Sequence, residues 1–242
     1  MQVGFHMHTR NSVDSNIEPK QLVDEALKIG LDCIVVTDHD SRAGALQCKE
    51  LAKNTPLQVV VAAEYRSDWG DVICAFIHSD CKERDPRHLV RETQSQGGIT
   101  ILPHPYSGHD NVEELGALCD AIEVFNARQR PSKNEPALAL AQRLKKPQIA
   151  GSDAHLIFEL RNCIMRLDCE TPLDAEKLLN APRSWVGQST ALANVRRSQA
   201  IKARRTKDFK LLTWSLAGIV KQRLKDKSKR ERFEGEWAPG SI

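Results

Sequence analysis

Residues 3–15 read VGFHMHTRNSVDS, a short apolar run that ends in two histidines and is followed by a polar loop. An apolar run of this length, bounded by polar residues, predicts a buried β-strand. His6 and His8 are two residues apart, and on extended backbone such side chains point the same way, so both can bind one ion. The stretch therefore predicts a strand whose carboxyl end carries a pair of metal ligands.

Apolar runs that end in polar residues recur up to about residue 187. We expect strands at 3–6, 33–37, 58–62, 72–77, 99–102, 121–124 and 148–150, with a weaker one at 163–167. Amphipathic helical patterns lie between them, such as the segment that Pro19 opens and Gly30 closes. Alternation of strands and helices with short connections predicts parallel strands in a barrel-like α/β sheet.

Polar side chains follow five of the expected strands directly. These side chains are His6 and His8, Asp38 and His39, Glu64, His104, and Asp153 with His155. Because the carboxyl ends of parallel strands share one rim of a closed α/β barrel, we expect them to form one site, together with Asp14. A lone histidine at a strand end is usually structural, and His78, His88 and His109 are interpreted in that way. Imidazole with carboxylate suits zinc, manganese or iron rather than calcium, and the number of donors predicts two or three ions.

The motifs HMHTRNSVDS, VTDHD, AAEY, PHP and GSDAH, in this order and spacing, closely resemble those of the PHP (polymerase and histidinol phosphatase) family. The resemblance covers roughly residues 1–187. It implies a distorted (βα)7 barrel with a two- or three-metal site that hydrolyses phosphoesters. Carried over by motif, it implies one ion on His6, His8, Glu64 and Asp153, a second on Glu64 and His104, and a third on Asp14, His39 and His155.

The sequence departs from the family pattern at one expected ligand. Many members carry a further histidine on the strand that follows the bridging glutamate, whereas here Ile73 or Cys74 stands at that point. The second ion is therefore expected to lose a ligand. Cys74 could replace that ligand only by pointing to the rim, and we expect it to pack in the core instead.

Cationic side chains near the rim are expected to hold the phosphate. Arg128 is the first choice, because the family often carries an Asn–small–Arg element like the one that begins at Asn126 and because the planar guanidinium binds phosphate through two hydrogen bonds. Asn126 is expected to contact the substrate as well. For Arg10 and Arg66, a surface ion pair is an equally good interpretation. A metal-activated water is the expected nucleophile. The candidates for proton transfer are Asp38 and His155.

Charge is distributed unevenly along the chain. Residues 193–242 carry 14 Lys and Arg against 5 Asp and Glu, a net +9, whereas the whole chain is only +3. Residues 189–233 show no strand pattern and are predicted to be helical, with an amphipathic segment at 207–225, and the last residues, ERFEGEWAPGSI, are expected to fray. We expect a basic helical extension, residues 188–242, beside a barrel of residues 1–187. Packing on the barrel or contact with an anionic membrane is favoured over nucleic-acid binding, because aromatic residues spaced for base stacking are missing.

Seven scattered cysteines without a C-x-x-C pair indicate reduced thiols and a cytoplasmic protein, and no secretory signal pattern is visible. The longest apolar run, 211–220, would be about 15 Å long as a helix, about half of a bilayer core. Neither of the nucleotide-binding motifs G-x-x-x-x-G-K-[ST] and G-x-G-x-x-G occurs.

Two function classes remain: a metal-dependent phosphoesterase acting on a phosphomonoester or nucleotide, and a weakly or non-catalytic metal-binding barrel whose basic tail contacts a membrane, a protein or nucleic acid.

Overall fold

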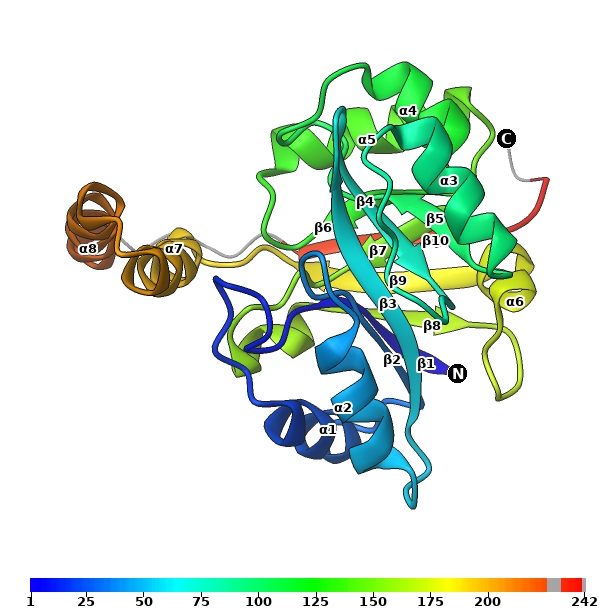
Figure 1. Ribbon diagram of the computed structural model, residues 1–242, viewed down its shortest axis with the longest axis horizontal. Helices are drawn as coiled ribbons and strands as arrows, with labels where there is room; N and C mark the ends of the chain where they lie inside the picture. Colours follow the sequence, from blue (N-terminus) through cyan, green and yellow to red (C-terminus); the bar gives the residue numbers. More distant parts are fainter. Residues whose placement is uncertain (226–231, 241–242) are drawn as a thin grey trace.

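The computed structural model describes residues 1–225 and 232–240 and confirms the predicted barrel (Figure 1). Its strands are neighbours in chain order: β1 (Gln2–Met7), β2 (Cys33–Val36), β3 (Gln58–Ser67), β4 (Gly70–Ala75), β5 (Ile99–Leu102), β6 (Ala121–Asn126) and β7 (Gln148–Gly151). The barrel closes where the chain after β7 reaches β1, through hydrogen bonds from Ser152 N to the Phe5 carbonyl and from Ala154 N to the His6 carbonyl. The carboxyl end of β1 therefore lies beside the residues that follow β7.

One strand runs against the predicted direction. β4 is antiparallel to both β3 and β5, whereas the other barrel neighbours are parallel. Only residues 68–69 separate β3 from β4, and a parallel connection needs about a dozen residues or more. As a consequence, the amino end of β4 reaches the rim at which its neighbours present their carboxyl ends.

Helices cover the outside of the barrel. They are α1 (Pro19–Lys28), α2 (Ala43–Ala52), α3 (Pro86–Ser95), α4 (Val112–Leu118), α5 (Pro131–Arg143) and α6 (Ala175–Asn180), with a 3-10 turn at Ile157–Asn162. α1, α3 and α5 each begin at a proline, whose fixed φ suits the first helical position. Asp85 also caps α3 by accepting hydrogen bonds from two backbone N–H groups.

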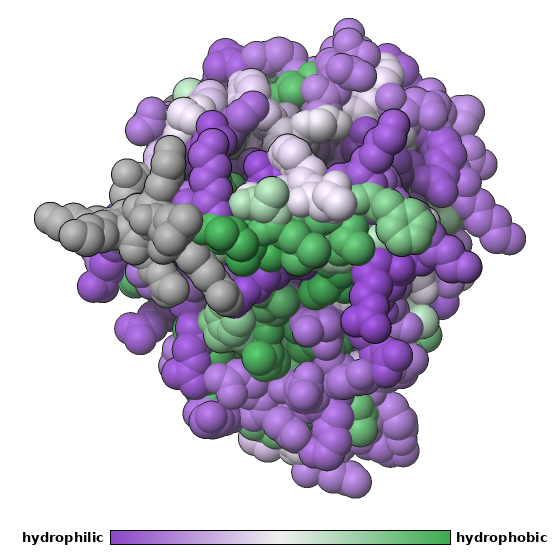
Figure 2. Space-filling model, turned by 90° about the vertical axis from the view of Figure 1, so that its left-hand side faces the viewer, coloured by the Kyte–Doolittle hydropathy of each residue, from purple (hydrophilic) through white to green (hydrophobic). Residues whose placement is uncertain are grey.

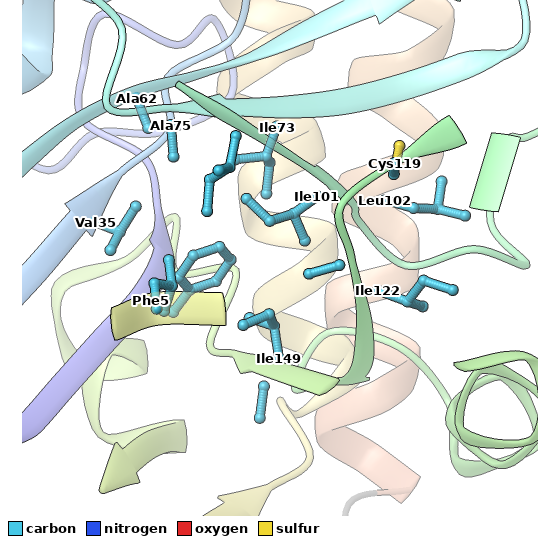
Figure 3. Close-up of a cluster of buried hydrophobic side chains, with 14 of the residues drawn as sticks. Phe5, Val35, Ala62, Ile73, Ala75, Ile101, Leu102, Cys119, Ile122 and Ile149 are labelled. Atoms are coloured by element: carbon cyan, nitrogen blue, oxygen red, sulfur yellow. The ribbon is translucent and has the colours of Figure 1, made fainter. Parts of the chain in front are cut away.

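Apolar side chains fill the interior of the barrel. Figure 3 shows Phe5, Ile73, Ile101 and Ile149 pointing toward one another from four different strands, and all four are fully buried. All seven cysteines are free and six of them are buried, as expected for thiols that pack as small hydrophobic groups. Because the interior is packed, the polar residues at the rim lie over an apolar floor.

The sheet continues past the barrel in strands that the sequence analysis missed in part. β8 (Cys163–Leu167) pairs with the first half of β1, β9 (Arg183–Gln188) pairs with β8, and β10 (Arg232–Trp237) pairs with β9, all antiparallel. β9 was not predicted, and the expectation of a frayed, strand-free end is wrong for β10. Phe233 packs its ring 5.3 Å from that of Phe125, and Gly235 lies so close to Trp185 that a Cβ would come within 2.1 Å of its ring. These long-range contacts return the end of the extension to the sheet.

Two helices lie at the end of the barrel where β1 terminates (Figure 1). They are α7 (Leu192–Thr206) and α8 (Phe209–Lys225), in the region predicted to be helical. The residues between α8 and β10 lie outside the described part of the chain. Every helix that the structure describes is too short or too polar to cross a bilayer.

Candidate metal centre

The backbone is irregular at the end of β1, where His6 and His8 lie. His6 has a φ of 62°, and the register of β1 against β2 shifts between Gly4 and Met7, so the strand is not regularly extended at this point. The rings of His6 and His8 nevertheless lie 5.2 Å apart. His104 and Asp153 also have positive φ values, 29° and 48°. Residues other than glycine rarely adopt such values, and they concentrate at functional sites.

Glu64 lies at the middle of the cluster. It lies within β3 rather than at the end of that strand. It faces the rim because β2 ends beside it, where the backbone of His39 forms an isolated parallel β-bridge with that of Glu64. The Nε2 atoms of His6 and His8 are each 3.4 Å from Glu64 Oε2. Asp153 Oδ1 lies 3.6 Å and 3.4 Å from the same two nitrogens. These four buried side chains form the first donor group.

A second donor group lies on the side of Asp14. The Nε2 atom of His39 is 3.6 Å from Asp14 Oδ2, and that of His155 is 3.3 Å from Asp14 Oδ1. His155 Nδ1 lies 2.9 Å from the carbonyl oxygen of Asp153, to which it can donate its proton, so that Nε2 is left to face Asp14 as a lone-pair donor. This group shares Glu64 and Asp153 with the first, because His39 Nδ1 is 3.3 Å from Glu64 Oε2 and His155 Nδ1 is 3.3 Å from Asp153 Oδ1.

A third donor group lies beside β4, where neither Ile73 nor Cys74 is a ligand, as expected, and where a carboxylate that was not predicted takes part. Ile73 pairs with Glu64 across the strands but is fully buried in the core, and Cys74 is buried too. The nearest donor is Asp71, which together with Glu64 and His104 places ligand atoms within 4.8 Å of one another. The sequence analysis missed Asp71 because it sought ligands at carboxyl ends of strands, whereas β4 presents its amino end to the rim.

The structure thus brings all eight predicted ligands, and Asp71, into one cluster. The Nε2 atoms of His6 and His8 are buried and have no hydrogen-bond partner among the described residues. Burial lowers the pKa of His8 to about 3, which keeps its ring neutral. Burial opposes ionisation of Asp14 and Asp153 as well, but the neighbouring histidines outweigh it and hold the pKa of both carboxyls below the usual range. Neutral imidazole and ionised carboxylate are the donors that a divalent transition metal requires, so the residues fit such ions.

Three other histidines carry the opposite shift. At His6, the effect of burial is outweighed by the carboxylates of Glu123, Asp153 and Glu64, which raise the pKa well above its usual value. Burial lowers the pKa of His39 and His104, but Glu64 outweighs it in both cases, helped by Asp14 for His39, and the pKa of each is about 9. The metal-free cluster therefore holds protons on these rings at neutral pH.

Buried hydrogen bonds from residues outside the cluster orient the predicted ligands. Glu123 Oε1 accepts from His6 Nδ1 at 2.9 Å, and Glu123 Oε2 accepts from the backbone N–H of His104 and from the amide of Asn126, both at 2.9 Å. Such partners fix the tautomer of a ligating histidine. A Cβ at residue 151 would lie 2.1 Å from Glu123 Oε1, so this packing requires Gly151. The sequence analysis missed Glu123, although a charged residue inside the apolar strand AIEVFN was a usable signal.

Asp38 and Asn126, which were predicted as site residues, also form hydrogen bonds that orient the cluster. Asp38 accepts from the backbone and hydroxyl of Thr9, both at 2.6 Å, and from Ser12 Oγ at 2.7 Å. Ser12 Oγ is also 3.0 Å from His8 Nδ1. Asn126 is fully buried and donates to Glu123 and Asp153. The geometry favours positioning roles for Asp38 and Asn126 over the proton transfer and substrate contact predicted for them.

The three predicted arginines occupy different places. Arg128 is buried with its Nε 3.8 Å from Asp153 Oδ2 and its Nη1 3.6 Å from Glu159 Oε2, and Nη1 has no hydrogen-bond partner among the described residues. Arg10 and Arg66 are exposed and form ion pairs with Glu18 and Asp71. Arg128 alone of the three is buried beside the cluster.

Helix α7 forms hydrogen bonds with the rim of the barrel that carries the cluster. Arg128 Nη2 donates to Ser198 Oγ at 2.6 Å, and Arg205 Nη1 donates to the carbonyl oxygen of Ser12 at 2.7 Å. Ser12 lies in the loop that carries Asp14, so one helix contacts both the buried arginine and a ligand-bearing loop. The start of the basic extension therefore belongs to the surroundings of the site.

Comparison with known proteins gives matches over most of the barrel. The PHP domain matches residues 4–152, and a PHP-associated region matches residues 131–184. An uncharacterised protein of Methanocaldococcus jannaschii is 32% identical over 146 residues, 54% of this chain and 84% of that protein. A two-domain protein from Bacteroides vulgatus, described as containing a predicted PHP-like metal-dependent phosphoesterase, is similar in structure with a TM-score of 0.56 and 21% identity, over 85% of this chain and 63% of that one. An amidohydrolase from Chromobacterium violaceum, with bound sulfate and no metal, has a TM-score of 0.54 and 14% identity, over 63% of this chain and 87% of that one.

Proposed function

The chain belongs to the PHP-domain family, as its motifs predicted, and from this premise we propose that it is a metal-dependent phosphoesterase acting on a phosphomonoester or a nucleotide. One observation carries the proposal: a buried arginine, Arg128, lies beside Asp153 at the edge of a cluster of imidazole and carboxylate donors. A cationic group next to a set of cation ligands suits a substrate that carries several anionic oxygens.

The donor groups define where divalent ions would bind. One ion would be held by His6, His8, Glu64 and Asp153, a second by Glu64, His104 and Asp71, and a third by Asp14, His39 and His155. When bound, such ions lower the pKa of a water molecule and polarise a phosphoryl oxygen. Because imidazole and carboxylate donors suit these metals, we propose zinc, manganese or iron as the native metal.

The side chains around the ions have separate tasks. Arg128 would bind a phosphoryl oxygen through its guanidinium, which is held in place by the hydrogen bond from Nη2 to Ser198 and by the ion pair of Nη1 with Glu159. Glu123 and the Asp153 carbonyl hold the protons on Nδ1 of His6 and His155, so that the Nε2 atoms stay free as ligands. His155 is therefore better suited to metal binding than to proton transfer.

Two considerations support a phosphoester over other substrates. A structurally similar protein from Bacteroides vulgatus is described as containing a predicted PHP-like metal-dependent phosphoesterase. A guanidinium is also suited to a tetrahedral anion, because its planar set of donors can bond two oxygens at once. The alternative of a non-catalytic metal-binding barrel gives no physical reason for burying an arginine whose Nη1 has no hydrogen-bond partner among the described residues.

The test combines metal analysis with turnover. We expect purified protein reconstituted with manganese or zinc to contain two or more ions per chain and to hydrolyse p-nitrophenyl phosphate, and we expect Arg128→Ala to retain the ions but lose most of this turnover. Arg161→Ala, which removes an exposed arginine paired with Glu25, is the matched control. Metal-loaded protein that hydrolyses p-nitrophenyl acetate but not the phosphate would refute the substrate class, and loaded protein inert toward both would favour the non-catalytic alternative.

A further inference from the structure

Helix α8 exposes a stripe of large apolar side chains. Phe209, Leu212, Leu216 and Val220 follow one another at helical spacing, and Phe209, Leu216 and Val220 are 74%, 50% and 60% exposed. Figure 2 looks onto the side of the molecule that carries α7 and α8, and it shows a continuous hydrophobic band bordered by hydrophilic side chains. We call these four residues the α8 stripe. Contiguous exposed apolar patches of this kind mark interaction sites.

The opposite side of α8 is already occupied. Ser215 is buried, and a Cβ at Gly218 would lie 3.0 Å from Arg196 on α7. The guanidinium of Arg196 lies 3.2 Å from the centre of the Trp214 ring. α7 in turn is hydrogen-bonded to the rim of the barrel: Arg205 donates a hydrogen bond to it and Ser198 accepts one from it. The α8 stripe thus faces outward from a helix pair that is attached to the body of the protein.

The charge of the helix pair is strongly positive. Residues 192–225 contain ten Lys and Arg and one acidic residue, Asp208. Lys210 and Lys221 lie between the α8 stripe and Trp214 on the surface of the helix, because they stand four residues before and seven residues after Trp214. An apolar helix face bordered by cations is the pattern of a helix that lies in the headgroup region of an anionic membrane.

We propose that the α8 stripe binds an anionic lipid surface, with α8 lying parallel to the membrane. Two other occupants fit less well. Nucleic acid has no use for Leu212, Leu216 and Val220, since its backbone contacts are ionic and its bases stack on aromatic rings. Pairing of two stripes in a dimer would bring two helix pairs of high positive charge together, and like charges repel. The proposal does not depend on the phosphoesterase function.

Vesicle sedimentation of the full-length protein tests the proposal. We expect wild-type protein to sediment with vesicles of phosphatidylcholine and phosphatidylserine, to bind pure phosphatidylcholine vesicles weakly, and to dissociate as salt is raised. The double variant Leu216→Gln with Val220→Gln should bind about tenfold or more weakly, because two side chains no longer enter the apolar layer. The matched control is Leu46→Gln with Leu51→Gln on α2, where the two leucines are 45% and 46% exposed.

Several outcomes would overturn the proposal. Wild-type protein that stays in solution with anionic vesicles would do so, as would a stripe variant that binds as tightly as wild type. Light scattering that shows a wild-type dimer and a monomeric stripe variant would assign the α8 stripe to a second copy of the chain. Far-UV circular dichroism and metal content should be unchanged in both double variants, which separates a loss of docking from a loss of folding.

Discussion

Replacing Glu123 by glutamine tests whether the metal centre depends on residues that do not touch the ions. The carboxylate accepts three hydrogen bonds: from His6 Nδ1 on one oxygen, and from His104 N and the Asn126 amide on the other. A glutamine of the same size has only one acceptor oxygen. If this oxygen faces His6, the new NH2 group points at two donors, and if the amide is reversed, the NH2 group forces His6 to place its proton on Nε2.

The magnitude follows from this geometry. Glu123 is 1% exposed, so water cannot replace the lost acceptor. A buried hydrogen bond to a charged group contributes about 1.5–3 kcal/mol, which corresponds to a factor of about 10–150 in an equilibrium constant. Loss of an outer partner of a ligating histidine typically weakens metal binding or activity by about 10- to 100-fold. We therefore expect Glu123→Gln to weaken binding of the ion at His6 and His8 by about 10- to 100-fold.

Calorimetric titration with manganese or zinc, repeated with a competing chelator, measures this effect directly. Glu92→Gln serves as control, because Glu92 accepts two backbone hydrogen bonds at the surface, away from the cluster. Circular dichroism shows whether both variants keep the fold. A Glu123→Gln protein that is folded and binds metal within twofold of wild type would refute the reasoning that Glu123 sets the tautomer of His6.

Four further outcomes are expected. Asp153→Ala should remove most bound metal and nearly all turnover while the fold persists, and metal analysis that finds full occupancy would contradict its placement among the ligands. Asp71→Asn should lower the number of tightly bound ions by one, whereas Cys74→Ser should leave that number unchanged, as plasma mass spectrometry can show. Because the pKa of His39 and His104 is raised to about 9, protons compete with metal below that pH, so affinity should rise between about pH 6.5 and 9 in calorimetry. The same shift stabilises the metal-free fold fully below about pH 6.5 and is lost as the pH rises through about 9, which thermal melts in chelator should show. Ending the chain after Gln188 removes the contacts of α7 with Arg128 and Ser12 and should reduce turnover of a small soluble phosphoester at least tenfold; unchanged turnover would show that α7 does not support the site.

Local patterns were sufficient for most of the barrel. Short apolar runs that end in polar residues identified the seven barrel strands and placed His6, His8, Asp38, His39 and the residues after β7 at one rim, because the order of strands along the chain is also their order in the sheet. The same reasoning failed at β4, where a two-residue turn reverses the strand. It therefore expected the second ion to lose a ligand at Ile73 or Cys74, both of which are buried in the core, and it missed Asp71.

Contacts between distant residues decided the rest. Glu123 reaches His6 across the barrel, 117 positions away in the chain, and no local pattern specifies such a pair. β10 joins the sheet because Phe233 and Gly235 fit against Phe125 and Trp185, although its sequence, rich in glutamate, has weak strand propensity. The amino-acid sequence by itself determined the family, the barrel and the eight donors that were predicted, since these depend on short motifs and on periodicity. Only the tertiary structure decided which side chains support those donors, where the extension packs and which apolar face of α8 stays exposed, because burial and hydrogen bonding are properties of the assembled chain.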